Sequence, residues 1–227
     1  MGLLRKEGDR TQCLSEQQFY QLREGAMVIE KDGYGEKVLH LPDSSFLKLF
    51  RQRHFFSISR IFPYSLRFIR NTIQLSERGI PTVTVKGYYR IPSIRRTAVQ
   101  YQPLPGETLR KVFLSIDKPE EQTGLLQRVA HFVALLHRKG VYFRSLHMGN
   151  ILVQPDGELG LIDIADMRCY RHSLSESFRL RNFRHMARYR SDAELLLKNS
   201  LFSATYASLT DLEADKIDHV METTKSR

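Results

Sequence analysis

Apolar positions in the first third of the chain come in short runs separated by turn-forming residues. Between Ala26 and Phe50 these runs are interrupted by Asp32-Gly33-Tyr34-Gly35 and by Pro42-Asp43-Ser44-Ser45. Such interruptions between short apolar runs are typical of β-hairpins. The pattern predicts three antiparallel strands joined by tight turns, the third of them at Phe46–Phe50.

The apolar spacing then becomes helical. A helix is predicted around Ile61–Leu75, and Gly79-Ile80-Pro81 ends it. Two strand-like segments follow, Thr82–Tyr89 and Thr97–Tyr101, and the next helical pattern covers Glu120–Lys139.

The end of the chain combines helical and polar segments. Helices are predicted over Ser175–Tyr189 and Asp192–Leu201, followed by a polar tail to Arg227 that we expect to fray. The Pro- and Gly-containing segment Gln102–Glu107 resembles a hinge. We therefore predict an α+β fold with two lobes, a small antiparallel β-sheet N-lobe over 1–101 and a mainly helical C-lobe over 102–227.

Composition narrows the classes of protein. No apolar stretch approaches the roughly 18 residues that span a bilayer, and the first residues lack the features of a signal peptide. Only two cysteines are present, which fits a reducing compartment. These features predict a cytoplasmic protein.

The charge balance is strongly basic, with 35 Lys and Arg against 25 Asp and Glu and a net charge of +10. Such a chain is attracted to polyanions such as nucleotides, nucleic acids or an anionic membrane surface. The arginines concentrate in two groups, Arg51, Arg53, Arg60, Arg67 and Arg70, and then Arg168, Arg171, Arg179, Arg181, Arg184, Arg188 and Arg190. Neither group has an aromatic platform or a helix-turn-helix, which argues against nucleic acid; the second is either a partner surface or a solvated face.

The segment from Tyr142 to Asp163 reads Y-F-R-S-L-H-M-G-N-I-L-V-Q-P-D-G-E-L-G-L-I-D. In kinases the loop H-R-D-x-x-x-x-N supplies an Asp that accepts the proton of the substrate hydroxyl and an Asn that holds Mg²⁺; a second metal-binding Asp follows. Here Phe143-Arg144-Ser145 stands in the place of H-R-D, and Asn150 lies five positions after Ser145. The spacing of a kinase loop is present, but serine replaces the catalytic aspartate.

The residues after this loop predict a metal site. Apolar runs on both sides of Pro155-Asp156-Gly157 indicate a hairpin, which would bring Asn150 and Asp163 to the same edge. Amide and carboxylate oxygens suit Mg²⁺ bound to nucleotide phosphates. The alternative is structural: Asn150 caps a turn, and Asp163 ends a buried strand.

The N-terminal strands contain candidate phosphate ligands. Strand alternation places Lys48 on the same face as Phe46 and Phe50, and a buried ammonium needs an anion such as a nucleotide phosphate. A lysine that protects an edge strand from aggregation is the alternative. Gly33 and Gly35 would let backbone N–H groups approach a phosphate, although an ordinary hairpin turn also contains such glycines.

These residues together resemble the bacterial lipopolysaccharide core kinase family, kinase-like enzymes that phosphorylate heptose or Kdo sugars at the cytoplasmic face of the inner membrane. The resemblance runs from about Val28 to Tyr189. It rests on Phe46-Leu47-Lys48, Gly79-Ile80-Pro81, Leu104-Pro105-Gly106, Leu146-His147-Met148-Gly149-Asn150-Ile151-Leu152 and Leu161-Ile162-Asp163.

The resemblance implies a protein-kinase-like fold and an ATP-dependent sugar kinase. It assigns Lys48 to the phosphates of ATP, Asn150 and Asp163 to Mg²⁺, and the catalytic base to position 145. The implied partners are a lipopolysaccharide core sugar or its precursor, with peripheral contact to anionic inner-membrane lipid.

Ser145 departs from the family pattern, because a hydroxyl cannot serve as a carboxylate base at neutral pH. Asp166 and His147 are candidate substitutes, although Asp166 could instead pair with Arg168 or Arg144. The predicted helix before Gly79 also lacks a central glutamate to pair with Lys48. The alternative function is therefore a pseudokinase that binds nucleotide or a partner and regulates envelope assembly.

Overall fold

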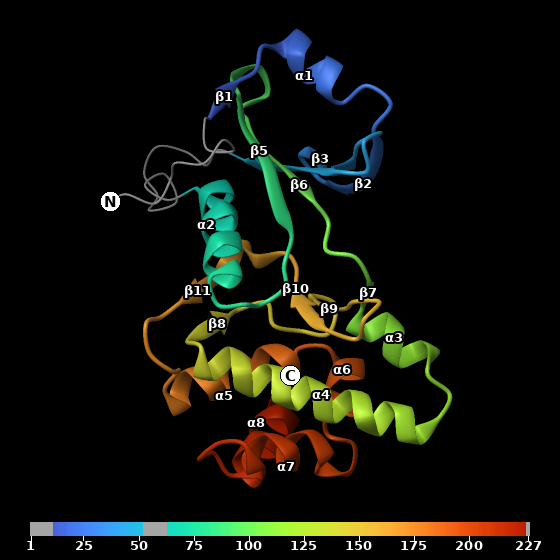
Figure 1. Cartoon of the computed structure of the whole chain (residues 1–227), viewed down its shortest axis with the longest axis vertical. Helices are drawn as coiled ribbons and strands as arrows, with labels where there is room; N and C mark the ends of the chain where they lie inside the picture. The colour runs from blue at the N-terminus through green and yellow to red at the C-terminus, as the bar shows by residue number, and fades with distance from the viewer. Residues whose placement is uncertain (1–10, 52–62, 226–227) are drawn as a thin grey trace. The chain divides into compact units, whose positions relative to one another are not determined.

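The computed structural model describes residues 11–51 and 63–225 and divides into two units. The first contains the described residues up to Ile73 together with Thr82–Leu104, and the second contains Gln74–Pro81 and the described residues from Pro105 onward. Strands dominate the first and helices the second (Figure 1), which confirms the predicted α+β, kinase-like fold class. The boundary between 101 and 102 stays a prediction, because grouping by contacts does not test separate folding. Predictions for Arg53, Arg60 and Ile61 lie outside the described residues.

The first unit is built on one six-stranded sheet. Its elements are β1 (Gln12–Cys13), α1 (Glu16–Leu22), β2 (Met27–Asp32), β3 (Gly35–His40), β4 (Phe46–Arg51), α2 (Tyr64–Ser76), β5 (Thr84–Ile91), η2 (Pro92–Ile94) and β6 (Arg96–Gln102). The strand order is β1-β5-β6-β4-β3-β2, antiparallel except for the parallel pair of β1 and β5. The predicted strands are confirmed as β2, β3, β4, β5 and β6. The order also places β4 in the interior of the sheet.

The two faces of this sheet are covered by different helices. On one face, Leu47 of β4 belongs to a buried apolar cluster with Phe19 of α1. On the other face, Phe50 of β4 packs against Phe68 of α2, with ring centroids 6.0 Å apart. Because side chains alternate along a strand, Lys48 shares the face covered by α2.

The segment that follows α2 belongs to the second unit and is held there by hydrogen bonds. After Ser76 the chain turns at Gly79, whose φ of 63° is the left-handed conformation typical of a helix C-terminus. The Arg78 side chain donates to the backbone oxygens of Lys139 and Tyr170, each at 3.1 Å. The predicted end of the helix at Gly79-Ile80-Pro81 is confirmed.

The second unit is mainly helical. It contains β7 (Glu107–Thr108), α3 (Leu109–Ser115), α4 (Pro119–Arg138), β8 (Val141–Phe143), β9 (Ile151–Val153), β10 (Leu159–Leu161), η3 (Ile164–Asp166), β11 (Met167–Cys169), α5 (Glu176–Met186), α6 (Arg190–Leu196), η4 (Lys198–Ser200), α7 (Leu201–Ser208) and α8 (Ala214–Lys225). Its strands form two small sheets, β10-β9-β7 and β11-β8. The predicted hairpin is confirmed as β9 and β10, and the predicted helices as α4, α5 and α6.

The prediction of a fraying polar tail was wrong for the described residues up to 225. Helices α7 and α8 occupy this segment (red in Figure 1). Phe202 and Tyr206, one helical turn apart, are fully buried, and so are Ile217 and Met221. These apolar residues at spacings of four form a buried stripe on each helix, which outweighs the polar composition of the segment.

A buried histidine connects three helices of the second unit to strand β8. The Nδ1 atom of His137 in α4 lies 2.8 Å from the Tyr206 hydroxyl of α7, and its Nε2 lies 3.2 Å from Asn182 Oδ1 of α5. Asn182 in turn donates its Nδ2 to the backbone oxygen of Phe143 at 2.7 Å. This orientation of the amide implies that Nε2 carries the proton and that Nδ1 accepts from Tyr206. Burial lowers the pKa of His137 to about 3.

The depressed pKa of His137 predicts a loss of stability in mild acid. The unfolded chain binds a proton near pH 6.5 whereas the folded chain excludes it down to about pH 3. Stability is therefore fully present above the unfolded value and falls as the pH drops below it. Chemical denaturation should show a loss of about 2 kcal/mol between pH 7 and pH 5 from this residue.

The matched variants are His137→Gln and His131→Gln on the same helix. The first should flatten the dependence of unfolding free energy on pH, and the second, at an exposed position, should leave it steep. An NMR titration in which the His137 ring protonates near pH 6.5 would contradict the prediction.

Candidate active site

The loop between β8 and β9 is a succession of tight turns. Leu146 N–H donates to Phe143 O at 3.2 Å, His147 N–H to Ser145 O at 2.9 Å, and Asn150 N–H to His147 O at 2.9 Å. Buried apolar side chains at Phe143 and Leu146 fasten the loop to the core of the second unit. The polar residues between them are therefore displayed from a fixed backbone.

Ser145 of this loop forms a hydrogen bond with Asp166 of η3. The Ser145 hydroxyl donates to Asp166 Oδ2 at 2.6 Å, and Asp166 Oδ1 is buried without a hydrogen-bond partner among the described residues. Burial is the main cause that raises the pKa of the Asp166 carboxyl, and the neighbouring Asp163 adds to it. A carboxylate thus stands directly behind the serine that replaces the catalytic aspartate.

Asn150 and Asp163 lie at the same edge of the β9–β10 hairpin. The Asn150 backbone oxygen accepts from Ile162 N–H at 3.0 Å, which sets Asn150 beside the residue before Asp163. The Asn150 side chain donates its Nδ2 to Ser145 O at 2.9 Å, so its Oδ1 is the oxygen left to accept or coordinate. Asp163 is exposed and has a φ of 52°. This left-handed conformation is unfavourable for residues other than glycine, and such residues are frequent at functional sites.

These two residues have the donor chemistry that Mg²⁺ prefers, an amide oxygen and a carboxylate. Among the described residues no group of three or more His, Cys, Asp or Glu side chains could hold a metal. Mg²⁺ usually binds through one or two protein oxygens together with substrate phosphates. Asn150 and Asp163 therefore fit a metal ion that arrives with a nucleotide.

His147 lies in the same loop, half-buried. Its Nδ1 accepts from Gly149 N–H at 3.2 Å, and its ring meets Tyr189 edge-on at 5.1 Å. Burial and the charge of Arg110 lower the pKa of His147, which keeps the imidazole neutral. The other ring nitrogen, Nε2, lies 3.3 Å from Asn150 Nδ2, so both ring nitrogens already have partners within the loop.

One anchor of the loop was not anticipated from the sequence. Asp192 of α6 has a fully buried side chain and accepts two hydrogen bonds of 2.8 Å from Arg110 of α3. The same carboxylate accepts from Met148 N–H at 3.2 Å. Arg110 and Asp192 stand 82 positions apart, so no local pattern could have paired them.

The other predicted residues lie in the first unit. Lys48 is 7% exposed, with its ammonium about 6 Å from the rings of Phe50 and Phe68. The edge-strand explanation for this lysine was wrong, because β4 pairs with β3 on one side and β6 on the other. Gly33 and Gly35 flank the tip of the β2–β3 turn, where Asp32 Oδ1 accepts from Tyr34 N–H at 2.8 Å. Their phosphate roles stay predictions.

The second unit contains a segment that is similar to a known family. The model of the lipopolysaccharide kinase (Kdo/WaaP) family matches residues 110–211. The predicted family is confirmed over this segment. A search of curated proteins gave no match.

The segment of this chain that matches the family begins at Arg110 and ends at Asp211. It contains Ser145, Asn150, Asp163 and Asp166. The match supports a kinase of lipopolysaccharide core biosynthesis. Within the described residues, none of the helices has the length and apolar character needed to cross a membrane.

The two partners of the loop anchor should differ in their effect on stability. Arg110→Ala leaves the buried Asp192 carboxylate uncompensated and should cost about 3–5 kcal/mol of unfolding free energy. Asp192→Asn leaves Arg110, whose side chain is 33% exposed, able to hydrate, so its cost should be smaller. Urea denaturation of both variants measures the difference.

The control is Arg190→Ala, which removes a guanidinium from the exposed pair with Glu194 and should change stability by less than about 1 kcal/mol. Equal losses of unfolding free energy in Arg110→Ala and Arg190→Ala would show that the buried ion pair stabilises the protein no more than an exposed one.

Proposed function

We propose that this protein transfers the γ-phosphoryl group of ATP to a hydroxyl of a heptose or Kdo sugar in the lipopolysaccharide core, with Ser145 and Asp166 together as the proton acceptor. The 2.6 Å hydrogen bond between these two side chains carries the proposal. It brings a carboxylate from η3 to the loop position where the kinase motif has lost its own. The match to the lipopolysaccharide kinase family supports the substrate class.

The proton follows a two-step route. The acceptor hydroxyl donates its proton to Ser145 Oγ while the Ser145 proton passes to Asp166 Oδ2. The sugar oxygen then forms its bond to the γ-phosphorus as the bond to the β–γ bridging oxygen breaks and ADP leaves. Phosphoryl transfer has a loose transition state and depends mainly on positioning and charge, so an indirect base is sufficient.

The raised pKa of Asp166 favours this role. A carboxylate whose pKa lies above the ordinary value is a stronger base, and a catalytic group works best when its pKa approaches the working pH. His147 is a weaker candidate, because its Nδ1 already accepts from the Gly149 N–H.

The proposal keeps the nucleotide and metal ligands that the family resemblance implies. Lys48, Gly33 and Gly35 bind the phosphates, while Asn150 and Asp163 hold Mg²⁺. When bound, Mg²⁺ neutralises the charge of the transferring phosphates. We place the enzyme at the cytoplasmic face of the inner membrane, where its excess of basic residues attracts anionic lipid.

Removal of the relay should slow transfer without preventing nucleotide binding. Asp166→Asn and Ser145→Ala should each lower the transfer rate by roughly 10²- to 10⁴-fold, the usual value of general-base help. Labelled ATP with deacylated core oligosaccharide measures the rate. The control is Asp156→Asn, at an exposed turn carboxylate of the β9–β10 hairpin.

Three outcomes would count against this reading. A wild-type rate for Asp166→Asn would exclude the relay, and equal transfer from wild type and Asp163→Ala would exclude the metal role. Thermal stabilisation by Mg-ATP with no transfer by the wild-type protein would favour the pseudokinase, whose motivating observation is Ser145 at the position of the catalytic aspartate.

Restoring the kinase aspartate should not by itself raise activity. In Ser145→Asp a second carboxylate would stand where the Ser145 hydroxyl now meets Asp166 at 2.6 Å, and two such carboxylates cannot both ionise at low cost. We expect Ser145→Asp to transfer no faster than wild type, and Ser145→Asp with Asp166→Ala to transfer faster than Ser145→Asp alone. A large gain from the single substitution would mean that Asp166 takes no part.

A further inference from the structure

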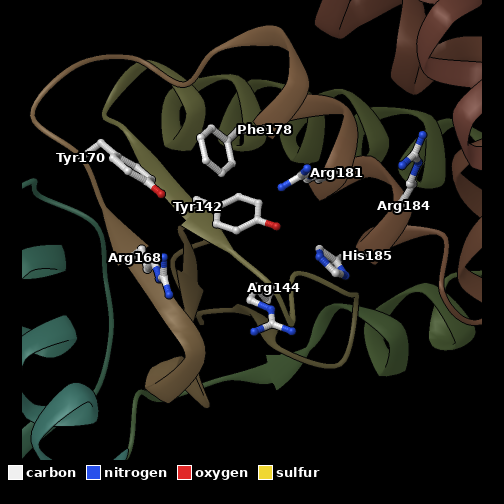
Figure 2. A pocket seen from close by; sticks show the side chains of 8 residues that line it. All are labelled: Tyr142, Arg144, Arg168, Tyr170, Phe178, Arg181, Arg184 and His185. Carbon is white, nitrogen blue, oxygen red and sulfur yellow. The ribbon is translucent and has the colours of Figure 1, made fainter. Parts of the chain in front are cut away.

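A basic pocket lies beside the catalytic loop, entirely within the second unit. Its volume is about 540 Å³, inside the range of roughly 300–1,000 Å³ typical of small-molecule sites. Figure 2 shows its lining, which consists of Tyr142, Arg144, Arg168, Tyr170, Phe178, Arg181, Arg184 and His185. We refer to it as the arginine pocket.

Two strands and one helix build the arginine pocket. In the antiparallel pair of β8 and β11, Tyr142 lies directly opposite Arg168, so both side chains point to the same face. Phe178, Arg181 and His185 follow one another at spacings of three and four along α5, which places them on one face of that helix. The local periodicities of both elements therefore converge on one cavity.

One wall of the pocket is aromatic. The ring of Phe178 lies 4.9 Å from that of Tyr142 and 5.3 Å from that of Tyr170. Such a wall offers apolar area to the C–H face of a sugar ring and hydroxyl groups to its edge.

The rest of the lining is positively charged. Arg144, Arg168, Arg181 and Arg184 are all exposed, and among the described residues none forms a salt bridge with a carboxylate. No residue of the lining is acidic. Burial is the main cause that lowers the pKa of His185, and the positive charges of Arg144 and Arg188 lower it further. This effect is expected where positive charge is not neutralised. Guanidinium groups bind phosphate bidentately and strongly.

One hydroxyl of the lining points into the pocket. Tyr142 is only 7% exposed, yet its hydroxyl makes no hydrogen bond within the described part of the chain. Figure 2 shows this oxygen directed into the space between β8, Arg181 and His185. A phenol hydroxyl can both donate and accept, so this position suits a hydrogen bond to a ligand oxygen.

The pocket adjoins the residues of the proposed proton route. Arg144 directly precedes Ser145, and Arg168 follows two residues after Asp166. The charge of Arg144 also acts on Asp166, where it partly opposes the effect of burial on the pKa. A ligand in the arginine pocket therefore lies close to the acceptor position.

We propose that the arginine pocket binds a sugar phosphate, with the phosphate ester on the guanidinium groups and the sugar ring on the aromatic wall. Assigning this ligand to an already phosphorylated part of the lipopolysaccharide core rests on the proposed function. The binding of a phosphorylated saccharide does not rest on it. The enzyme thus recognises an acceptor that already carries a phosphate at a different position from the one it modifies.

Isothermal titration calorimetry on the full-length protein tests the pocket without requiring turnover. The probes are deacylated phosphorylated core oligosaccharide, the same oligosaccharide after phosphatase treatment, inorganic phosphate, and phosphatidylglycerol vesicles. The pocket variant is Arg168→Gln with Arg181→Gln. The matched control is Arg128→Gln with Arg171→Gln, which removes the same charge at exposed positions outside the lining.

We expect the phosphorylated oligosaccharide to bind, and the pocket variant to weaken it by about tenfold or more while the control changes it by less than about twofold. Tyr142→Phe should weaken it by roughly threefold or more, through loss of one hydrogen bond. Equal weakening by pocket and control variants would overturn the proposal, since only net charge would then matter.

The other probes separate the alternatives. Equal affinity for inorganic phosphate or for the dephosphorylated oligosaccharide would refute a combined site for phosphate and sugar. If the protein bound the vesicles and none of the other probes, the ligand would be a lipid headgroup and the proposal of a sugar phosphate would be overturned. Binding that depends on the pocket, in a protein that transfers no phosphate, would support the pocket and refute the kinase function separately.

Discussion

The loop between β8 and β9 depends on one buried carboxylate, that of Asp192. An ionised side chain with no exposed area persists only where its charge and hydrogen bonds are satisfied, and here Arg110 and the Met148 N–H satisfy them. The contact joins α3, α6 and the middle of the loop, so the packing of two helices fixes the loop backbone. Ser145 and Asn150 take their positions from that backbone, through the turn hydrogen bonds on either side of Met148.

The parts of the fold that could be predicted are those with a strong local pattern. The hairpin of β9 and β10 has two apolar runs around a Pro-Asp-Gly turn, and α4 has apolar residues at helical spacing along its whole length. The end of the chain was mispredicted, because its overall polarity hid the stripe that includes Tyr206 and Met221. Composition averages over a helix, whereas burial depends on one face.

The candidate site also has parts that a local sequence pattern predicts and parts that it does not. Motif spacing alone identified Ser145, Asn150 and Asp163, and the hairpin brought the last two to one edge. The hydrogen bond that joins Ser145 to Asp166 spans 21 positions, and the sequence left Asp166 with Arg144 or Arg168 as equally reasonable partners. The loop anchor and the arginine pocket were beyond prediction, because they depend on strand register and helix packing rather than on spacing along the chain.

In the proposed reaction, charge offers a reason for serine at position 145. A phosphorylated sugar and a nucleotide triphosphate are both anionic, and bringing them together is opposed by their repulsion. In the proposal, Arg144 and Arg168 together with a cation on Asn150 and Asp163 would offset this repulsion. A carboxylate at position 145 would face the anionic acceptor directly, whereas Asp166 carries its charge one hydrogen bond further back. Moving the base behind a neutral hydroxyl lowers that repulsion, at the expense of direct proton abstraction.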